Sequence, residues 1–119
     1  MADHNTLGSA GEMLAMDWLS VNGFEVLHHN WRYRRYEIDV IAMREGILHF
    51  VEVKSRKESA FGNPEDSVSR KKFRFLQKAA QGYLNRFPGI RWIRYDILAI
   101  TFRRNGEPDY FFLEDVFIN

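Results

Sequence analysis

The sequence predicts an α/β domain in which helices flank a mixed central β-sheet, with the element order α-β-β-β-α-β-β. Two segments carry apolar residues at helical spacing, and five segments are rich in apolar or alternating residues, as strands are. The second helical segment is long enough to cross over between two parallel strands, which a hairpin turn cannot do. Parallel and antiparallel pairing are therefore expected in one sheet, and 119 residues favour a single domain over residues 1–119.

The first half of the chain is expected to contain one helix and three strands. Leu14, Trp18 and Val21 recur at helical spacing, and the Asn22-Gly23 pair that follows is typical of a helix end. The two clearest strands are joined by a tight turn. The expected elements are a helix over residues 8–22, strands over 24–31, 36–43 and 47–54, a basic connector at 32–35 and the turn at Glu45-Gly46.

The second half is expected to contain one helix and two strands. A polar loop comes first, and the helix after it has an inner side that includes Val68, Lys72 and Tyr83. The helix ends before Pro88-Gly89 because proline cannot continue it. The expected elements are a loop over residues 55–66, a helix over 67–85, a strand over 91–102, a turn at Asn105-Gly106 and a last strand over 110–117.

Composition excludes several classes of protein and site. There is no cysteine, so no disulfide framework, thiolate metal site or cysteine nucleophile can exist. No apolar run approaches the roughly 20 residues of a membrane-spanning helix, and the N-terminus lacks the features of a secretory signal. These observations predict a cytoplasmic protein with no membrane association.

Charge is unevenly distributed along the chain, although the formal net charge is only +1. All 17 basic residues lie between Arg32 and Arg104, where they face eight acids, and both ends of the chain carry acids only. This asymmetry indicates a basic surface that faces a polyanion. A solvated surface of mixed charge explains the same pattern equally well, and charge alone does not decide between them.

The register of the hairpin over residues 36–54 follows from its turn. If Glu45-Gly46 is a two-residue turn, Arg44 faces Ile47, Asp39 faces Glu52 and Glu37 faces Lys54. These acids and the lysine then share one face, since side chains alternate with period two. The expected members of that face are Glu37, Asp39, Ile41, Met43, Leu48, Phe50, Glu52 and Lys54, and those of the other are Ile38, Val40, Ala42, Val51, Val53 and a packed His49.

The charged end of this hairpin has two possible explanations. Opposed like charges destabilise a sheet, so Asp39 facing Glu52 calls for a compensating partner. A divalent cation is one such partner, because hard metals bind clustered carboxylate oxygens. A surface ladder of salt bridges is the other, with Glu37 neutralising Lys54 and both acids solvated.

Motifs over most of the chain resemble a known superfamily. Asp39, followed by Glu52-Val53-Lys54 on the next strand, resembles the signature of the restriction-endonuclease-like PD-(D/E)xK superfamily. The closer resemblance is to the YraN-type family of small uncharacterised proteins, which are similar to archaeal Holliday-junction resolvases. Tyr36 is a departure, because such families commonly have glycine before Glu-Ile-Asp. Further matching positions are Gly11-Glu12, Asn30-Trp31-Arg32, Glu37-Ile38, Phe50-Val51, Ser55-Arg56, Phe61-Gly62-Asn63-Pro64, Lys72, Ala79-Ala80 and Arg94-Tyr95-Asp96.

The resemblance implies a restriction-endonuclease-like fold and a role for each residue of the charged cluster. Asp39 and Glu52 would hold Mg²⁺ or Mn²⁺, with the Val53 carbonyl completing the ligands and Glu12 as an outer or second-metal ligand. Lys54 would orient the attacking water or stabilise developing negative charge, so the catalytic residues would be Asp39, Glu52 and Lys54. Without the resemblance, Glu12 is an ordinary boundary residue of its helix.

Three functions fit the sequence. The first is an endonuclease acting on DNA, in a branched or damaged form, and joint cleavage of a junction would need two sites and hence a homodimer. The second is a nucleic-acid-binding accessory protein with little or no cleavage, and the third is an interaction module in which the charged cluster forms only salt bridges. Phosphate contacts are expected from Arg32, Arg56, Lys71 and Lys72, although Lys72 equally fits a lysine whose stem packs while its ammonium reaches water.

Overall fold

The computed structural model describes residues 2–59, 62 and 68–117, with side chains from residue 7 onward. It contains one mixed five-stranded sheet in the order β1-β2-β3-β4-β5, in which only β3 and β4 are parallel. The predicted class and element order are confirmed. The elements are α1 (Ala2–Val21), β1 (Glu25–Tyr33), β2 (Tyr36–Arg44), β3 (Ile47–Lys57), α2 (Arg70–Arg86), β4 (Ile93–Phe102) and β5 (Asp109–Leu113).

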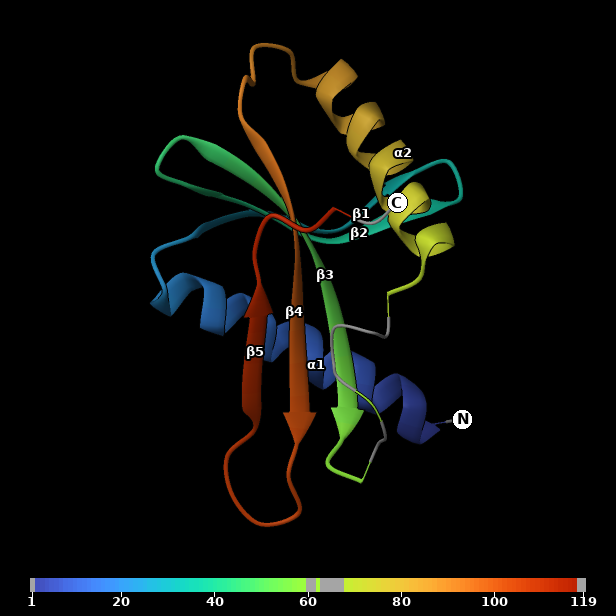
Figure 1. Cartoon of the computed structure of the whole chain (residues 1–119), viewed down its shortest axis with the longest axis vertical. Coiled ribbons are helices and arrows are strands. Elements are labelled where there is room, and N and C mark those ends of the chain that lie inside the picture. Colours follow the sequence, from blue (N-terminus) through green and yellow to red (C-terminus); the bar gives the residue numbers. More distant parts are fainter. Residues whose placement is uncertain (1, 60–61, 63–67, 118–119) are drawn as a thin grey trace.

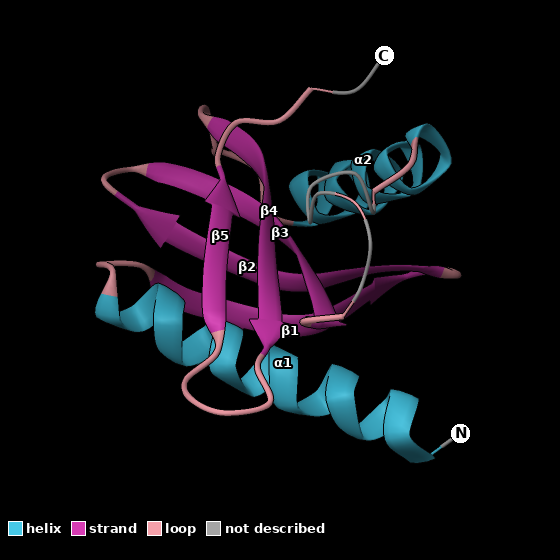
Figure 2. Ribbon diagram, turned by 60° about the horizontal axis from the view of Figure 1, so that its bottom comes forward, coloured by secondary structure: helices cyan, strands magenta, loops and turns pink. Residues whose placement is uncertain are grey.

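The sheet lies between the two helices, with α1 on one face and α2 on the other (Figures 1 and 2). Each helix covers its own apolar cluster. The cluster under α1 includes Leu19, Val40 and Leu98, and the cluster under α2 includes Phe50 and Phe73, all of them buried. Neither helix has the length and apolar character needed to cross a membrane, within the residues that the structure describes.

Helix α2 begins at a side-chain cap and connects the two parallel strands. The Ser69 hydroxyl accepts a hydrogen bond from the backbone N–H of Lys72 at 3.2 Å, which satisfies one of the free donors of the first turn. The helix ends at Arg86, and the N–H of the following cap residue, Phe87, donates to the Tyr83 carbonyl at 2.9 Å. The predicted crossover is confirmed, because α2 lies between β3 and β4 in the chain and these strands pair in parallel from Leu48–Ile93 to Lys57–Phe102.

Several predicted boundaries were wrong. Residues 32–35 are not a connector: β1 continues to Tyr33, which pairs with Tyr36 across a turn at Arg34-Arg35. The last strand ends at Leu113 rather than at residue 117. Beyond it, the Asp96 carboxylate accepts the Asp115 N–H at 2.9 Å and the Tyr95 carbonyl accepts the Val116 N–H at 2.7 Å, so two single hydrogen bonds follow the regular ladder. The predicted loop motif at residues 61–64 lies, except for Gly62, outside the described residues, as does residue 67 of the predicted helix.

A buried histidine–aspartate pair joins the two parallel strands of the sheet. His49 is packed as predicted, with 1% of its surface exposed, and its Nδ1 lies 2.5 Å from Oδ2 of the buried Asp96. Asp96 therefore links β3 to the segment after β5. Its place among the matching motifs did not reveal this role, because both of its partners come from distant parts of the chain.

The β2–β3 hairpin has the predicted register near its turn and departs from it further away. Arg44 faces Ile47 and Val40 faces Val51, and Glu45 and Gly46 both have positive φ, as the two-residue turn requires. The pairing stops at Val40–Val51. Beyond this point β3 continues to Lys57 beside β4 alone, so the two strands of the hairpin part at Asp39 and Glu52.

The alternation of β2 also breaks at Asp39. Ile38 was predicted on the face with Val40, and it packs instead in the cluster under α2. The pairing of β1 with β2 skips Asn30 and Asp39, and Asn30 adopts a positive φ of 51°. A left-handed residue in a strand bends it, so the prediction failed because strict alternation assumes an unbent strand.

Candidate functional site

The gap where β2 and β3 part opens into a cavity of about 190 Å³ lined by charged side chains. Asp39 comes from β2, Glu52 and Lys54 from β3, and Glu12 from α1. These four predicted residues and Val53, whose carbonyl was the other expected ligand, therefore line one cavity together with Lys72 from α2. The remaining lining residues are Leu7, Gly8 and Ser55.

Asp39 takes the place of the missing backbone pairing. Its Oδ2 accepts a hydrogen bond from the Val53 N–H at 2.8 Å. The N–H and C=O of a strand residue point toward the same neighbouring strand, so the Val53 carbonyl faces the same gap as the Asp39 carboxylate. A backbone oxygen and a carboxylate thus meet at the edge that β2 has left.

Burial and neighbouring acids strongly raise the pKa of the Asp39 carboxyl group. Loss of solvent, together with the charges of Glu52 and Glu12, raises the pKa of Asp39 to about 8 against the opposing hydrogen bond from Val53. A carboxylate with a raised pKa beside two other acids is expected in a site that binds a positive charge. The predicted repulsion between Asp39 and Glu52 is therefore present.

Lys72 supplies a positive charge to the cluster. Its Nζ lies 2.9 Å from Oε2 of Glu52, whose side chain is 11% exposed, while that of Lys72 is 49% exposed. Burial lowers the pKa of Lys72, but the charge of Glu52 and their hydrogen bond outweigh it, so the net pKa is raised. Sequence reasoning placed Lys72 on the inner side of its helix but missed this ion pair, which depends on how α2 lies over β3.

Lys54 lines the cavity and lacks the salt bridge to Glu37 that the alternative explanation of the charged cluster required. Glu37 instead forms a long ion pair with Arg32 at 3.9 Å, on the exposed surface of β1 and β2. The predicted pairing of Glu37 with Lys54 is wrong, because the two strands of the hairpin part before these residues could face each other. Burial lowers the pKa of Lys54, and the nearby charge of Lys72 lowers it further.

A close helix contact places Glu12 at the cavity. Gly11 lies against Ser55 so closely that a Cβ at Gly11 would stand 1.7 Å from the serine Oγ. A larger residue there would force the Ser55 hydroxyl to turn away and would still lie 3.1 Å from the Ser55 Cβ. Gly11 therefore brings the next residue, Glu12, to the mouth of the cavity, where the sequence alone could not separate a ligand from a boundary acid.

The donor set fits a hard divalent cation, although the side chains are not arranged as a cage. Carboxylates and a backbone carbonyl are the oxygen donors that Mg²⁺ and Mn²⁺ take. No group of three acidic or histidine side chains is close enough to hold a metal, among the residues that the structure describes. Glu52 forms an ion pair with Lys72 instead, so the lysine ammonium neutralises the charge of this acid.

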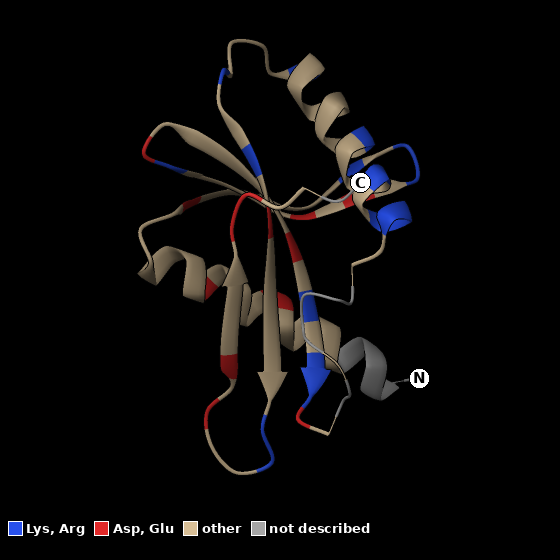
Figure 3. Ribbon diagram, viewed as in Figure 1, with Lys and Arg blue, Asp and Glu red and all other residues tan. Residues whose placement is uncertain are grey.

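Basic residues gather beside this cavity. Figure 3 shows them at the start of α2 and around the β1–β2 turn. Arg32 and Lys71 are exposed there, whereas Arg56 lies on β3 beyond Lys54 and is partly buried. Lys72 differs from the other predicted phosphate contacts, since its ammonium binds Glu52 inside the site.

The mixed sheet covered on both faces, with acids and lysines where two strands part, makes this chain an α/β domain that fits the restriction-endonuclease-like class. It belongs to the uncharacterised protein family UPF0102, whose pattern matches residues 11–100. The chain is 42% identical to a UPF0102 protein of Flavobacterium johnsoniae over 111 residues, covering 90% of this chain and 89% of the relative. It is 39% identical to one of Bacteroides fragilis over 100 residues, covering 84% and 83% respectively.

Proposed function

We propose that this protein is a Mg²⁺- or Mn²⁺-dependent endonuclease that hydrolyses phosphodiester bonds in DNA. One observation carries the proposal: Asp39, Glu52 and Lys54 line one cavity at the point where β2 and β3 part. Burial and the charges of Glu52 and Glu12 raise the pKa of the partly buried Asp39 to about 8. A divalent cation bound there would offset both effects, because its charge favours the ionised carboxylate.

Each residue has a role that follows from its position. Asp39, Glu52 and the Val53 carbonyl would hold the cation, which supplies charge neutralisation at the scissile phosphate and an acidified water. Lys54 would orient the attacking water or donate a hydrogen bond to the phosphate as its negative charge develops. Its lowered pKa brings proton exchange at the amine closer to neutral pH.

Lys72 would act as a built-in counterion. Without a divalent cation it neutralises Glu52 at 2.9 Å. When a cation takes its place, the half-exposed ammonium is free to turn outward to a DNA phosphate. Lys72 would then move from an internal ion pair to a substrate contact, which reconciles its predicted role with its observed partner.

Metal binding can be tested without any substrate. A ligand that binds only the folded state raises its stability by mass action, so Mg²⁺ or Mn²⁺ should raise the melting temperature. Asp39→Asn should reduce this rise, whereas Asp109→Asn, an exposed acid outside the cavity, should leave it unchanged. An equal rise in all three proteins would show a general salt effect and would contradict the metal site.

Cleavage is tested by incubating the protein with duplex, single-stranded, flap and four-way DNA in Mg²⁺ or Mn²⁺. Products are expected with wild type, and none in EDTA or with Asp39→Asn. The alternative, an accessory protein that binds DNA without cutting it, is favoured by the Glu52–Lys72 ion pair, which neutralises the site without metal. Binding without cleavage of any of these forms would establish that alternative.

A further inference from the structure

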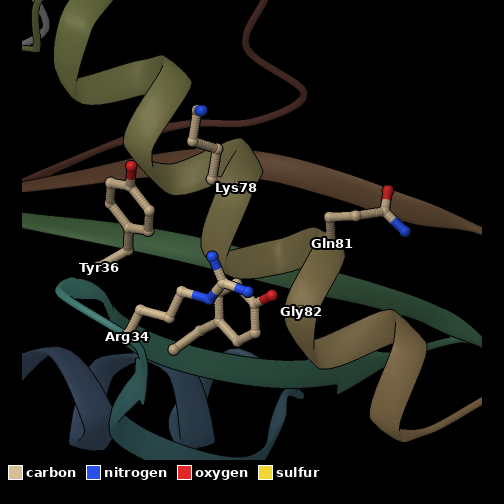
Figure 4. A pocket seen from close by; sticks show the side chains of 6 residues that line it. Arg34, Tyr36, Lys78, Gln81 and Gly82 are labelled. Atoms are coloured by element: carbon tan, nitrogen blue, oxygen red, sulfur yellow. The ribbon is translucent and has the colours of Figure 1, made fainter.

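A second pocket lies beside the β1–β2 turn and combines aromatic rings with basic side chains. Its volume is about 270 Å³, and it is lined by Tyr33, Arg34, Tyr36, Lys78, Gln81 and Gly82. Figure 4 shows Arg34 and Tyr36 of the turn region facing Lys78 and Gly82 of α2 across it. All of its lining residues are described, and none is acidic. Its volume is close to the lower end of small-ligand pockets, roughly 300 Å³.

The two tyrosine rings are held in place by α2. A Cβ at Gly82 would lie 2.4 Å from the ring of Tyr33, so glycine is needed for the ring to rest on the helix backbone. The ring of Tyr36 lies 5.0 Å from that of Phe75 on the same helix. Both tyrosines remain partly exposed. Fixed and partly exposed rings can stack on a ligand with little loss of side-chain freedom.

Cations surround these rings. The guanidinium of Arg34 lies 5.3 Å from the ring centre of Tyr33, and that of Arg35 lies 5.3 Å from the ring centre of Tyr36. Lys78 of α2 supplies a further cation, and its ammonium lies 5.9 Å from the ring centre of Tyr36. Stacking surfaces combined with positive charge bind nucleotides, whose bases stack while their phosphates pair with the cations.

An unpaired nucleotide fits this pocket better than a duplex does. A duplex presents mainly phosphates and base edges, while its base planes are stacked inside and cannot reach a recessed ring. A base outside a duplex can enter the hollow and lie on Tyr36 or on the Arg34 guanidinium. A flat basic surface without the rings would serve a duplex equally well, so the aromatic lining is what distinguishes the two.

The pocket and the acidic cavity are spaced along the same two elements. Tyr36 precedes Asp39 by three residues on β2, about 10 Å of strand. Lys78 follows Lys72 by six residues on α2, about 9 Å of helix. At the 3.4 Å spacing of one stacked DNA strand, this separation corresponds to about three nucleotides.

We infer that the pocket between the β1–β2 turn and α2 binds an unpaired nucleotide of DNA next to the candidate active site. The inference rests on the proposed function in one respect, because it takes DNA as the substrate. It adds that the substrate contains a single-stranded segment. The departure at Tyr36 then has a use, because a glycine there would remove one of the two stacking rings.

The test compares binding of a short fluorescein-labelled oligothymidine with that of a duplex of equal length, by fluorescence anisotropy in EDTA. Tyr36→Leu and Arg34→Asn should each weaken oligothymidine binding about tenfold while changing duplex binding less than about twofold. Asparagine suits position 34, where φ is +58°. Trp92→Leu and Arg91→Gln, an exposed aromatic and an exposed basic residue outside the pocket, are the matched controls and should leave binding unchanged.

Each outcome decides the proposal. No loss in either variant, or an equal loss for both DNA forms, would overturn it and leave only a general basic surface. If circular dichroism shows that Tyr36→Leu is misfolded, Arg34→Asn decides alone, since its side chain is exposed on a turn. Binding is measured in EDTA, which prevents metal-dependent cleavage, so the two proposals can fail separately. If the variants lose oligothymidine binding selectively but the wild type cleaves no DNA, the pocket is retained and the nuclease is rejected. If the wild type cleaves DNA but the variants show no selective loss of binding, the nuclease is retained and the pocket is rejected.

Discussion

The two ends of the β2–β3 hairpin differ although they belong to the same pair of strands. Near the turn, from Val40–Val51 to Arg44–Ile47, the strands pair regularly and bury apolar side chains on both faces. Beyond Val40 and Val51 they part, and acids and lysines line the space between them. The closed end contributes stability, whereas at the open end side-chain contacts of Asp39 and Glu52 replace the regular backbone pairing and leave room for a binding site.

Truncating a core side chain at the closed end should give the largest effect. Phe50 is fully buried and contacts Tyr83 and Tyr95. Phe50→Ala should lower the free energy of unfolding by about 3–5 kcal/mol, as cavities left by large side chains do. Urea denaturation monitored by circular dichroism measures this. A loss below about 1 kcal/mol would mean that the closed end is not the rigid part of the hairpin.

Removing the lysine of the open end should affect turnover rather than folding. If Lys54 acts in the transition state, Lys54→Ala should reduce metal-dependent cleavage by about 10²–10³-fold, the effect of losing one such donor. DNA affinity and the melting temperature should change little, because Lys54 is one of many cations near the DNA. Cleavage at the wild-type rate would show that the open end does not use this lysine.

Neutralising the acid at the opening should stabilise the metal-free protein in a pH-dependent way. The raised pKa of Asp39, about 8 against 3.8 for the free side chain, means that the folded state holds a proton that the unfolded state releases. The contribution of this proton to the free energy of unfolding is fully present below about pH 4 and is lost as the pH rises toward 8. Asp39→Asn should therefore unfold like wild type near pH 4 and be more stable at pH 8, by at most about 5 kcal/mol for a shift of this size.

The measurement is thermal or urea unfolding in EDTA across this pH range. Asp109→Asn is the matched control, since its carboxylate lies on an exposed salt bridge with Arg103 at 3.2 Å and should show no such rise. If Asp39→Asn is less stable than wild type at pH 8, the ionised Asp39 carboxylate is not destabilised by its surroundings, and this prediction is wrong.

The smallest effect is expected on the basic surface outside the cavity. Lys71 is exposed at the start of α2 and is one cation among several. Lys71→Ala should weaken DNA binding modestly and lower the slope of log affinity against log salt by about 1. Lys72→Ala provides the contrast, because it also removes the counterion of Glu52 and should change metal binding. Identical behaviour of the two variants would place Lys72 on the surface with Lys71.

The sequence by itself determined the element order, the crossover helix and the register of the β2–β3 turn. These depend on local causes, namely apolar spacing, the two positive-φ residues of the turn and the length of the second helix. The same reasoning predicted that Asp39 and Glu52 would lie together, and both line one cavity although they do not pair across the hairpin. It also predicted that His49 would be packed, because its neighbours on that face are apolar.

Only the tertiary structure decided where the hairpin opens and which groups meet there. The opening depends on the bend at Asn30 and Asp39 and on the pairing of β3 with β4, and these involve segments far apart in the chain. Glu52 therefore binds Lys72 across 20 residues, and Lys54 has no bridge to Glu37. Alternation and turn chemistry act over a few residues, whereas ion pairs form between whatever side chains the packed helices bring together.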